Sequence, residues 1–274
     1  MTMEEKFDLF TKKMFTKQKL CSTIYRNIIY CARRRYVIMD QPKYQRVLLK
    51  LSGEALAPKE DGILDFDFIE RVAQQIKKCV NAGVQVAVIV GAGNIWRGRQ
   101  GTGMDRCRAD HMGMLATVIN SIALQDVFLR VGMEAVVMTA VEMKAFADSY
   151  TARDAIKALE GGKVVIFGGG LGIPFFSTDT AAALRAAEIN ADCILMAKNI
   201  DAIYSADPKL DPNAVRYSDL TYLQIIEQNL RALDMSSATF CMDNNINGYA
   251  FGLADPENIY RVVMGEPVGT AIHN

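Results

Sequence analysis

The chain has 274 residues, half of them hydrophobic and 23% of them charged, and its formal net charge is zero. This composition is that of an ordinary globular protein, with enough chain for one large domain or two small ones. The balanced total hides an asymmetry: residues 1–38 hold nine Lys and Arg against three acids, whereas residues 39–274 hold 22 basic and 28 acidic side chains. A strongly basic surface is therefore not expected on the larger part, and nucleic acid is not an expected partner.

The first 38 residues differ from the rest and have three interpretations. They read as a basic amphipathic helix that binds an anionic surface, as poorly ordered chain, or as a leader upstream of a natural start at Met39. The first of these depends on apolar side chains at helical spacing, namely Phe7, Phe10, Met14 and Phe15. The segment lacks the apolar stretch of a secretory signal. We expect residues 1–41 to be an N-terminal extension outside the fold and residues 42–274 to form one domain.

From Arg46 onward, short apolar runs alternate with amphipathic segments. The apolar runs predict strands at Val47–Leu51, Gln85–Val90, Ala135–Thr139, Val164–Phe167, Cys193–Met196 and Ile259–Met264. The segments between them predict helices at Asp67–Asn81, Ala109–Val131, Thr151–Glu160, Asp179–Asn190, Thr221–Asn229 and Met235–Asn245. The first of these helices should bury one face, made of Phe68, Val72, Ile76 and Val80. Because several strands are apolar on both faces, the pattern predicts an α/β fold in three layers, with a largely parallel central sheet between helices.

The cysteine and histidine usage points to a reducing compartment and away from a zinc site. Six cysteines are scattered without a C-x-x-C pair, and the chain has only two histidines. Cys79 and Cys193 lie in apolar segments and are expected to be buried free thiols, which suits a cytoplasmic location. No apolar run approaches the roughly 20 residues of a membrane helix, so no membrane is expected as a partner.

Glycines and charged residues follow four of the predicted strands. These stretches read KLSGE (50–54), GAGNIWRG (91–98), GGGLGIPFFSTD (168–179) and AKNID (197–201). In an open parallel sheet, ligands bind outside the carboxyl ends of the strands, and exposed backbone amides in glycine loops suit phosphate. The chain has no G-x-x-x-x-G-K-[ST] sequence, and Gly91 and Gly93 lack the third glycine of a dinucleotide-binding loop. The pattern therefore predicts an anion site that is neither a P-loop nor a Rossmann loop.

The charged residues at these strand ends each have a structural alternative. Lys50 is either a lysine that extends to solvent or the cation of the anion site, and the following Gly53 would let a ligand approach the backbone. Arg97 is either a surface residue or a planar donor for phosphate oxygens. Asp179 and Asp110 are each explained equally well as caps of the helices that they begin.

Six motifs together resemble the bacterial uridylate kinases of the amino acid kinase family. They are KLSGEAL (50–56), GAGNIWRG (91–98), ADHMGMLAT (109–117), PFFSTDTAAALRAAE (174–188), DAIYSADP (201–208) and RVVMGEPVGT (261–270). The resemblance runs from about Tyr44 to the C-terminus. It implies the α/β fold of that family and transfer of the γ-phosphoryl group of MgATP to UMP, giving UDP for pyrimidine nucleotide biosynthesis.

The resemblance also implies roles for individual residues. The implied catalytic residues are Lys50, Asp179 and, with the weakest match, Asp234. Positions that match ATP-binding residues are Lys50, Leu51, Ser52, Gly53, Gly93, Arg97, Lys198, Tyr204 and Asp207; the last three surround the base and ribose. Positions that match UMP-binding residues are Ala92, Asp110, Leu171, Gly172, Ile173, Pro174, Phe175, Phe176, Ser177 and Thr178. No protein ligand for the metal is implied, since Mg²⁺ would arrive on ATP.

Two departures from the family pattern concern the nucleotide sites. The acceptor loop reads Gly170-Leu-Gly-Ile-Pro174 where the family has G-T-G-N-P, so a hydroxyl and an amide are missing at Leu171 and Ile173. Discrimination of UMP from CMP is accordingly expected to be less secure. Ala92 replaces a common glycine, which is tolerable if its φ is negative.

The resemblance further implies a homohexamer that GTP activates and UTP inhibits. Two other functions fit the sequence less well. A kinase that forms an acyl phosphate on aspartate, glutamate or acetylglutamate fits poorly with Asp110 in DHMGMLAT and with the lack of a further regulatory domain. A nucleotide-sensing or nucleic-acid-binding regulator fits poorly with the joint presence of Lys50, Arg97 and Asp179, because a sensor needs no lysine at the transferring phosphoryl group.

Overall fold

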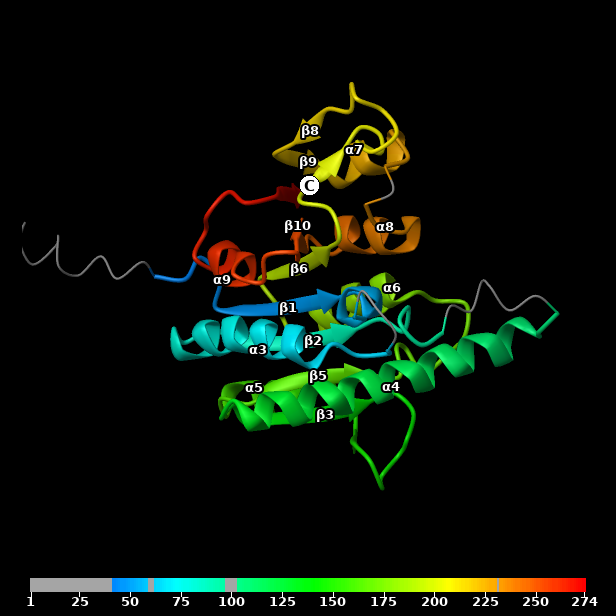
Figure 1. Cartoon of the computed structure of the whole chain (residues 1–274), viewed down its shortest axis with the longest axis vertical. Helices are drawn as coiled ribbons and strands as arrows, with labels where there is room; N and C mark the ends of the chain where they lie inside the picture. Colours follow the sequence, from blue (N-terminus) through cyan, green and yellow to red (C-terminus); the bar gives the residue numbers. More distant parts are fainter. Residues whose placement is uncertain (1–40, 59–61, 97–102, 231) are drawn as a thin grey trace, which may run out of the picture. The chain divides into compact units, whose positions relative to one another are not determined.

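The computed structural model describes residues 41–58, 62–96, 103–230 and 232–274, and residues Pro42–Asn274 form a compact unit. The predictions for residues 1–38 and for Arg97 lie outside the described residues. The main sheet has the strand order β4-β3-β5-β2-β1-β6-β10-β11-β9 (Figure 1). Its strands are β1 (Arg46–Leu51), β2 (Gln85–Val90), β3 (Ala135–Thr139), β4 (Asp148–Ser149), β5 (Val164–Gly168), β6 (Cys193–Lys198), β9 (Asp219–Thr221), β10 (Asn247–Gly252) and β11 (Thr270–His273).

The sheet is parallel throughout its described length except where β10 meets β11. In its centre, β1 lies between β2 and β6, with Lys50 opposite Ile89 on one side and Met196 on the other. The carboxyl ends of these strands consequently lie along one edge. A separate two-stranded antiparallel sheet joins β7 (Ile203–Tyr204) and β8 (Arg216–Tyr217).

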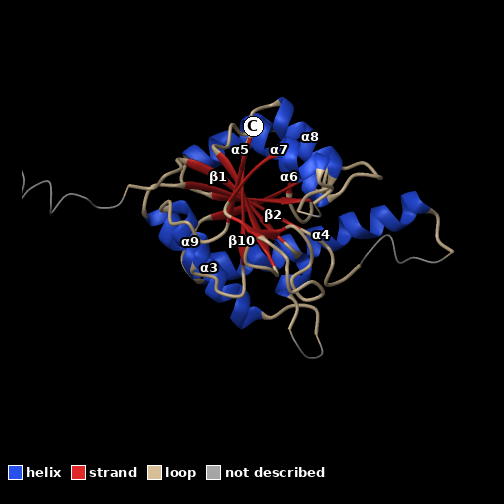
Figure 2. Ribbon diagram, turned by 90° about the horizontal axis from the view of Figure 1, so that it is seen from above, coloured by secondary structure: helices blue, strands red, loops and turns tan. Residues whose placement is uncertain are grey.

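Helices cover both faces of the sheet, as Figure 2 shows from above. They are α3 (Phe66–Asn81), α4 (Arg106–Arg130), α5 (Ala152–Glu160), α6 (Thr178–Glu188), α7 (Tyr222–Glu227), α8 (Met235–Asp243) and α9 (Asn258–Val263), with a 3₁₀ turn at Gly53–Leu56. The core divides into two clusters. One joins alternate residues of β1 to α3, α4 and α9, and the other joins Leu48 of β1 to α5, α6, α7 and α8. The predicted three-layer α/β fold is confirmed.

The buried face of α3 differs from the predicted one by part of a turn. The helix begins after Asp65, whose carboxylate accepts a hydrogen bond from the Phe68 amide. Val72 and Ile76 are fully buried as predicted, but Phe68 and Val80 are only partly buried. The remaining buried positions are Ile69, Ala73 and Cys79. Two of these, Ala73 and Cys79, are small side chains, which a search for large apolar residues overlooks.

The strand predicted at Ile259–Met264 is wrong, because this segment forms α9. Ile259, Val262 and Val263 are its buried residues, at the i, i+3, i+4 spacing of a helix. Asp255 starts the turn by accepting a hydrogen bond from the Glu257 amide, and Gly265 ends it with a φ of +88°. The β-branched side chains suggested a strand, but tertiary packing outweighed that preference. Strands β10 and β11, which lie inside the sheet between β6 and β9, were missed.

Helix α4 begins three residues earlier than predicted. Asp105 is its N-cap and accepts from the Arg108 amide, so Asp110 lies inside the helix and the alternative in which it caps α4 does not hold. In the described part of the chain, α4 is the one helix long and apolar enough to span a membrane by length and composition, which is weak evidence by itself. The helix is bonded to the sheet: Ser121 Oγ lies 3.4 Å from the carbonyl oxygen of Phe167 in β5, and Gln125 donates to Ala135 O of β3.

The cysteines in the described part are free. Cys79 and Cys193 are buried, as predicted, and burial raises the pKa of each thiol to about 12. Such thiols stay protonated at neutral pH and act as small core residues.

Candidate active site

The predicted strand-end lysine meets an aspartate from another layer of the fold. Lys50 lies near the carboxyl end of β1, and its Nζ is 2.8 Å from Oδ1 of Asp179 in the first turn of α6. Both side chains are mostly buried, with exposed fractions of 13% and 19%. The alternative in which Lys50 extends freely to solvent is therefore wrong. A buried, paired ammonium group on a rigid strand is suited to bind an anion in one fixed position.

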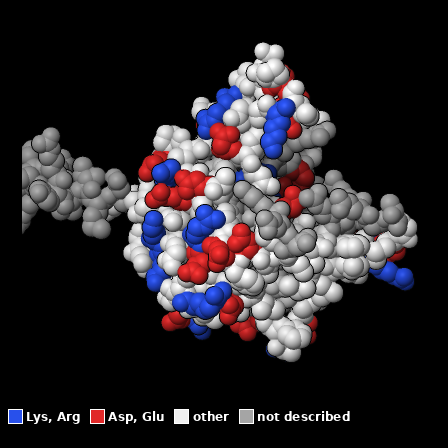
Figure 3. Space-filling view, in the orientation of Figure 1, with Lys and Arg blue, Asp and Glu red and all other residues white. Residues whose placement is uncertain are grey.

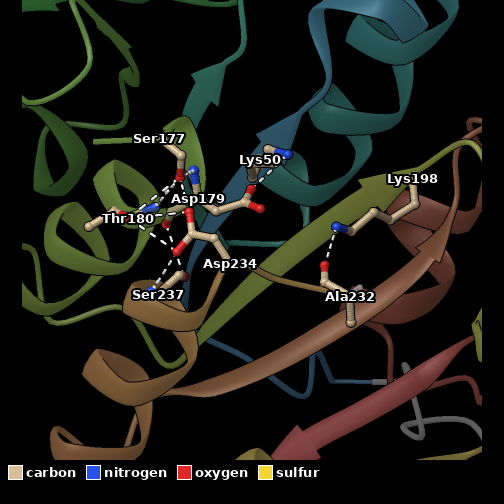
Figure 4. A network of polar contacts seen from close by, with 8 residues as sticks. All are labelled: Lys50, Ser177, Asp179, Thr180, Lys198, Ala232, Asp234 and Ser237. Carbon is tan, nitrogen blue, oxygen red and sulfur yellow. Dashed lines mark hydrogen bonds and ion pairs between the residues drawn. The ribbon is translucent and has the colours of Figure 1, made fainter. Parts of the chain in front are cut away.

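A second lysine, Lys198 at the end of β6, faces the same aspartate. Its Nζ donates to the carbonyl of Ala232 (Figure 4). Burial is the largest effect on the pKa of Lys198 and lowers it. The carboxylates of Asp179 and Asp234 raise this pKa and Lys50 lowers it, and the net result lies below the ordinary value. Burial alone would raise the pKa of Asp179, but Lys50 and Lys198 more than offset this and hold it below the ordinary value. The site thus combines an ionised carboxylate with two lysine side chains.

Asp234 connects two helix N-termini. It is the N-cap of α8 and accepts from the Ser237 amide at 2.7 Å, from the Ser177 hydroxyl, and from Thr180 Oγ1 at 3.3 Å. Ser237 Oγ in turn donates to the backbone carbonyl of Asp179. Ser177, not Asp179, caps α6, so the Asp179 side chain remains available to Lys50. These contacts, drawn in Figure 4, hold the first turn of α6 against α8.

Two glycine loops pack directly on each other. A Cβ atom on Gly53 would lie 2.5 Å from Gly91 O and 2.7 Å from Gly93 N, and one on Gly93 would lie 2.8 Å from the Glu54 side chain. Gly53 is thus required for contact between the loops after β1 and β2. The sequence interpretation, which assigned its small size to ligand approach, did not include this contact. Ala92 is not one of the described residues with a positive φ, so its methyl group is tolerated.

Helix α4 holds the glycine-rich loops that follow β2 and β5 in place. Asn120 is fully buried and donates to Gly91 O at 2.8 Å, and it exchanges two amide hydrogen bonds with Asn94. One turn earlier, Thr117 Oγ1 accepts from the Gly169 amide at 2.9 Å. Buried polar groups of this kind must be paired, so these bonds fix the loops. Sequence reasoning missed Asn94, Thr117 and Asn120; polar residues on an otherwise apolar helix face were the available signal.

The predicted acceptor residues meet near the start of α4. Asp110 Oδ2 accepts from the Phe175 amide at 2.8 Å and from Arg106 Nε at 2.9 Å. The loop before α6 thereby reaches Asp110, and it brings the predicted acceptor positions 171–178 with it. Ile173, Phe175 and Phe176 are more than half exposed.

Three predicted donor-site residues line one pocket. Lys198, Tyr204 and Asp207 border a pocket of 620 Å³ between the segment after β6 and the end of α7. Apolar side chains that include Ile203 and Leu230 form part of its lining. An adjoining pocket of 350 Å³ shares Lys198 and adds Asp179 and Asp234. Lys198 therefore lies between the partly apolar 620 Å³ pocket and the charged groups Asp179 and Asp234. The prediction had placed it farther from these charged groups, near the base and ribose of ATP.

Similarity to known proteins agrees with this geometry. The model of the amino acid kinase family matches residues 45–249. A UMP kinase from Bacillus anthracis is 38% identical over 84% of this chain and 96% of its own, with a TM-score of 0.81. A UMP kinase from Ureaplasma parvum is 36% identical over 85% of this chain and 100% of its own, also with a TM-score of 0.81. A uridylate kinase from Archaeoglobus fulgidus is 29% identical over 82% and 99%, with a TM-score of 0.64.

Proposed function

The chain belongs to the amino acid kinase family, and we propose that it is a UMP kinase that transfers the γ-phosphoryl group of ATP to UMP in pyrimidine nucleotide biosynthesis. The observation that carries this proposal is the Lys50–Asp179 pair at the edge where the glycine loops meet. An ammonium group held there by a buried carboxylate suits a phosphoryl group that is being transferred.

The chemistry needs little more than charge and position. The phosphate of UMP is already an anionic nucleophile, so no general base is required. The protein must hold two mutually repelling polyanions in line and offset the charge that spreads over the transferring group. Lys50 supplies this charge from β1, and Asp179 keeps its Nζ in place. The amides around Ser52 and Gly53 add nearby donors.

We assign the donor side to the pocket that contains Lys198, Tyr204 and Asp207. Its apolar part suits an adenine base, and Lys198 lies where the phosphates would extend toward Asp179. The lowered pKa of Lys198 belongs to the site without ATP; an added polyanion would favour its protonated form. Gly93 and Arg97 remain proposed ATP contacts on the basis of the sequence resemblance.

We assign the acceptor side to Asp110, Ala92 and the loop at 171–178. A carboxylate suits the ribose hydroxyls, which are donors. The exposed aromatic rings of Phe175 and Phe176 suit the base. The structure supports this division because Asp110 and the loop are joined by a hydrogen bond.

Mg²⁺ is proposed to enter with ATP. The described residues include no group of three His, Cys, Asp or Glu side chains that would hold a metal ion. Asp179 is already committed to Lys50, and Asp234 to Ser177, Thr180 and Ser237. Mg²⁺ commonly keeps several waters and binds substrate phosphates, so it needs few protein ligands here. The ion would neutralise phosphate charge when bound.

The assembly is proposed to be a cytoplasmic homohexamer that GTP activates and UTP inhibits. Support comes from α4, which exposes an apolar stripe on the molecular surface, where Figure 3 shows few charges. The stripe consists of Met112, Leu115, Ile119, Ile122 and Leu129. Stripes of this kind are usually covered by another subunit. We also propose that residues 42–274 make up the kinase domain and that residues 1–41 are an extension outside it.

The test is ADP formation by the full chain with MgATP and, in parallel, UMP, CMP, dTMP, aspartate or glutamate. Turnover with UMP is expected, and none with either amino acid. Turnover with an amino acid instead would indicate an acyl-phosphate kinase, and no turnover with any acceptor would contradict the kinase assignment.

A further inference from the structure

Two groups converge on the Asp110 carboxylate. The Phe175 amide and Arg106 Nε both donate to its Oδ2, at 2.8 and 2.9 Å. The Arg106 guanidinium group also lies 5.6 Å from the centroid of the Phe175 ring, within the range of a cation–π contact. Arg106 therefore contacts both the proposed acceptor carboxylate and the loop that would cover the acceptor.

Helix stability does not explain Arg106. It is the first residue of α4, where the helix dipole disfavours a cation. An arginine placed four residues before its aspartate is also the less favourable order for an i, i+4 pair. Exposed pairs of this type contribute little to folding, and the Arg106 side chain is 45% exposed. Its contacts with Asp110 and Phe175 are thus better explained by the site than by the fold.

The loop needs an outside support at Phe175. This residue has a φ of +72°, which is uncommon and strained for an aromatic side chain. Its ring is 63% exposed, so core packing does not hold it in place. The contacts with Asp110 and Arg106 are the observed interactions that oppose the strain.

We propose that Arg106 is a positioning residue for the acceptor nucleotide. It fixes the plane of the Asp110 carboxylate and holds the Phe175 segment in the conformation that receives UMP. Among the described residues, the bonds to this carboxylate fall on Oδ2, so Oδ1 is the oxygen presented to the ribose hydroxyls. This inference rests on the proposed function and names a residue that the sequence motifs did not single out.

The test compares Arg106→Ala with the wild-type full chain in steady-state kinetics. We expect the KM for UMP to rise by about tenfold, the effect typical of losing a charge-assisted contact. The KM for ATP and kcat should stay within about twofold, since Arg106 is not among the residues that line the proposed donor pockets. Arg106→Lys should restore part of the loss, because a lysine retains the charge.

A second readout does not depend on turnover. Trp96 is the single tryptophan of the chain, and its indole N–H donates to Ala109 O beside Asp110. Titration of Trp96 fluorescence with UMP should give the same shift in Kd as in KM. A double-mutant cycle of Arg106→Ala with Phe175→Leu should be non-additive, since the two side chains act together.

Arg130→Ala is the matched control. Arg130 forms an i, i+4 pair at the other end of the same helix, with Asp126 first in the sequence and 3.0 Å away, and its guanidinium group lies 5.9 Å from the Phe66 ring. The Arg130→Ala change should leave the KM for UMP unchanged. An unchanged KM for UMP in Arg106→Ala, or an equal rise in Arg130→Ala, would overturn the inference while leaving UMP kinase activity in place. Absence of UMP turnover by the wild type would instead overturn the proposed function.

Discussion

The ammonium group of Lys50 lies 2.8 Å from Oδ1 of Asp179 and joins the carboxyl end of β1 to the first turn of α6. If this pair carries the reaction, Lys50→Ala should lower kcat by at least about 100-fold, the usual effect of losing a preorganised charge. The fold should persist, because Lys198 still faces Asp179. Steady-state ADP formation and circular dichroism check both expectations. Lys78→Ala, which removes an exposed lysine 3.6 Å from Glu257, is the control; near-normal turnover in Lys50→Ala would contradict the mechanism.

Asp110→Asn should mainly raise the KM for UMP. The amide keeps the shape of the carboxylate but replaces one acceptor oxygen with a donor, which no longer suits ribose hydroxyls or Arg106. The KM for ATP should change little. An unchanged KM for UMP would mean that the acceptor site lies elsewhere.

Lys198 should make ATP binding sensitive to alkaline pH. Burial lowers its pKa in the free protein. The protonated form attracts the phosphates, so affinity for ATP is complete below this pKa and falls as the pH rises through it. The fall should begin at a lower pH than an ordinary lysine would give. Binding of ATP measured by calorimetry at increasing pH checks this. Lys198→Arg should remove this component of the pH dependence, because arginine stays protonated; an identical fall in that variant would rule Lys198 out.

Asn120→Ala should destabilise the protein and loosen the loop after β2. The change leaves Gly91 O and the Asn94 amide without their partner in a buried position. We expect a loss of about 1–3 kcal/mol in the free energy of unfolding, measured with urea. Asn81→Ala, at an exposed position of α3, is the control and should have a small effect. Equal effects of the two changes would contradict the supporting role of Asn120.

Ile173→Asn should sharpen the choice of UMP over CMP. The side chain is 53% exposed on the acceptor loop, so an amide there costs little packing and adds a donor and an acceptor for the base. The ratio of kcat/KM values for UMP and CMP should rise. Leu223→Asn, at a similarly exposed position of α7, should leave the ratio unchanged. No change in the Ile173 variant would place base recognition elsewhere.

The sequence alone determined the layered fold and the edge of the sheet where the site lies. Periodicity placed β1, β2, β3, β5 and β6, because buried parallel strands are continuous apolar runs. Lys50 and the glycine loops could be assigned to one edge because parallel strands share their carboxyl ends. Short edge strands and α9 were not recovered, since their character depends on neighbours distant in the chain.

Only the tertiary structure decided which groups meet. The Lys50–Asp179 pair, the approach of Lys198 to it and the Asn94–Asn120 bonds join residues between 19 and 148 positions apart. Local pattern cannot encode such contacts, because they depend on how helices pack against the sheet. For the same reason the sequence left capping open as an alternative for Asp110, whereas the structure places its carboxylate between Arg106 and Phe175. Its neighbour on the loop comes from position 175, and folding alone brings the two together.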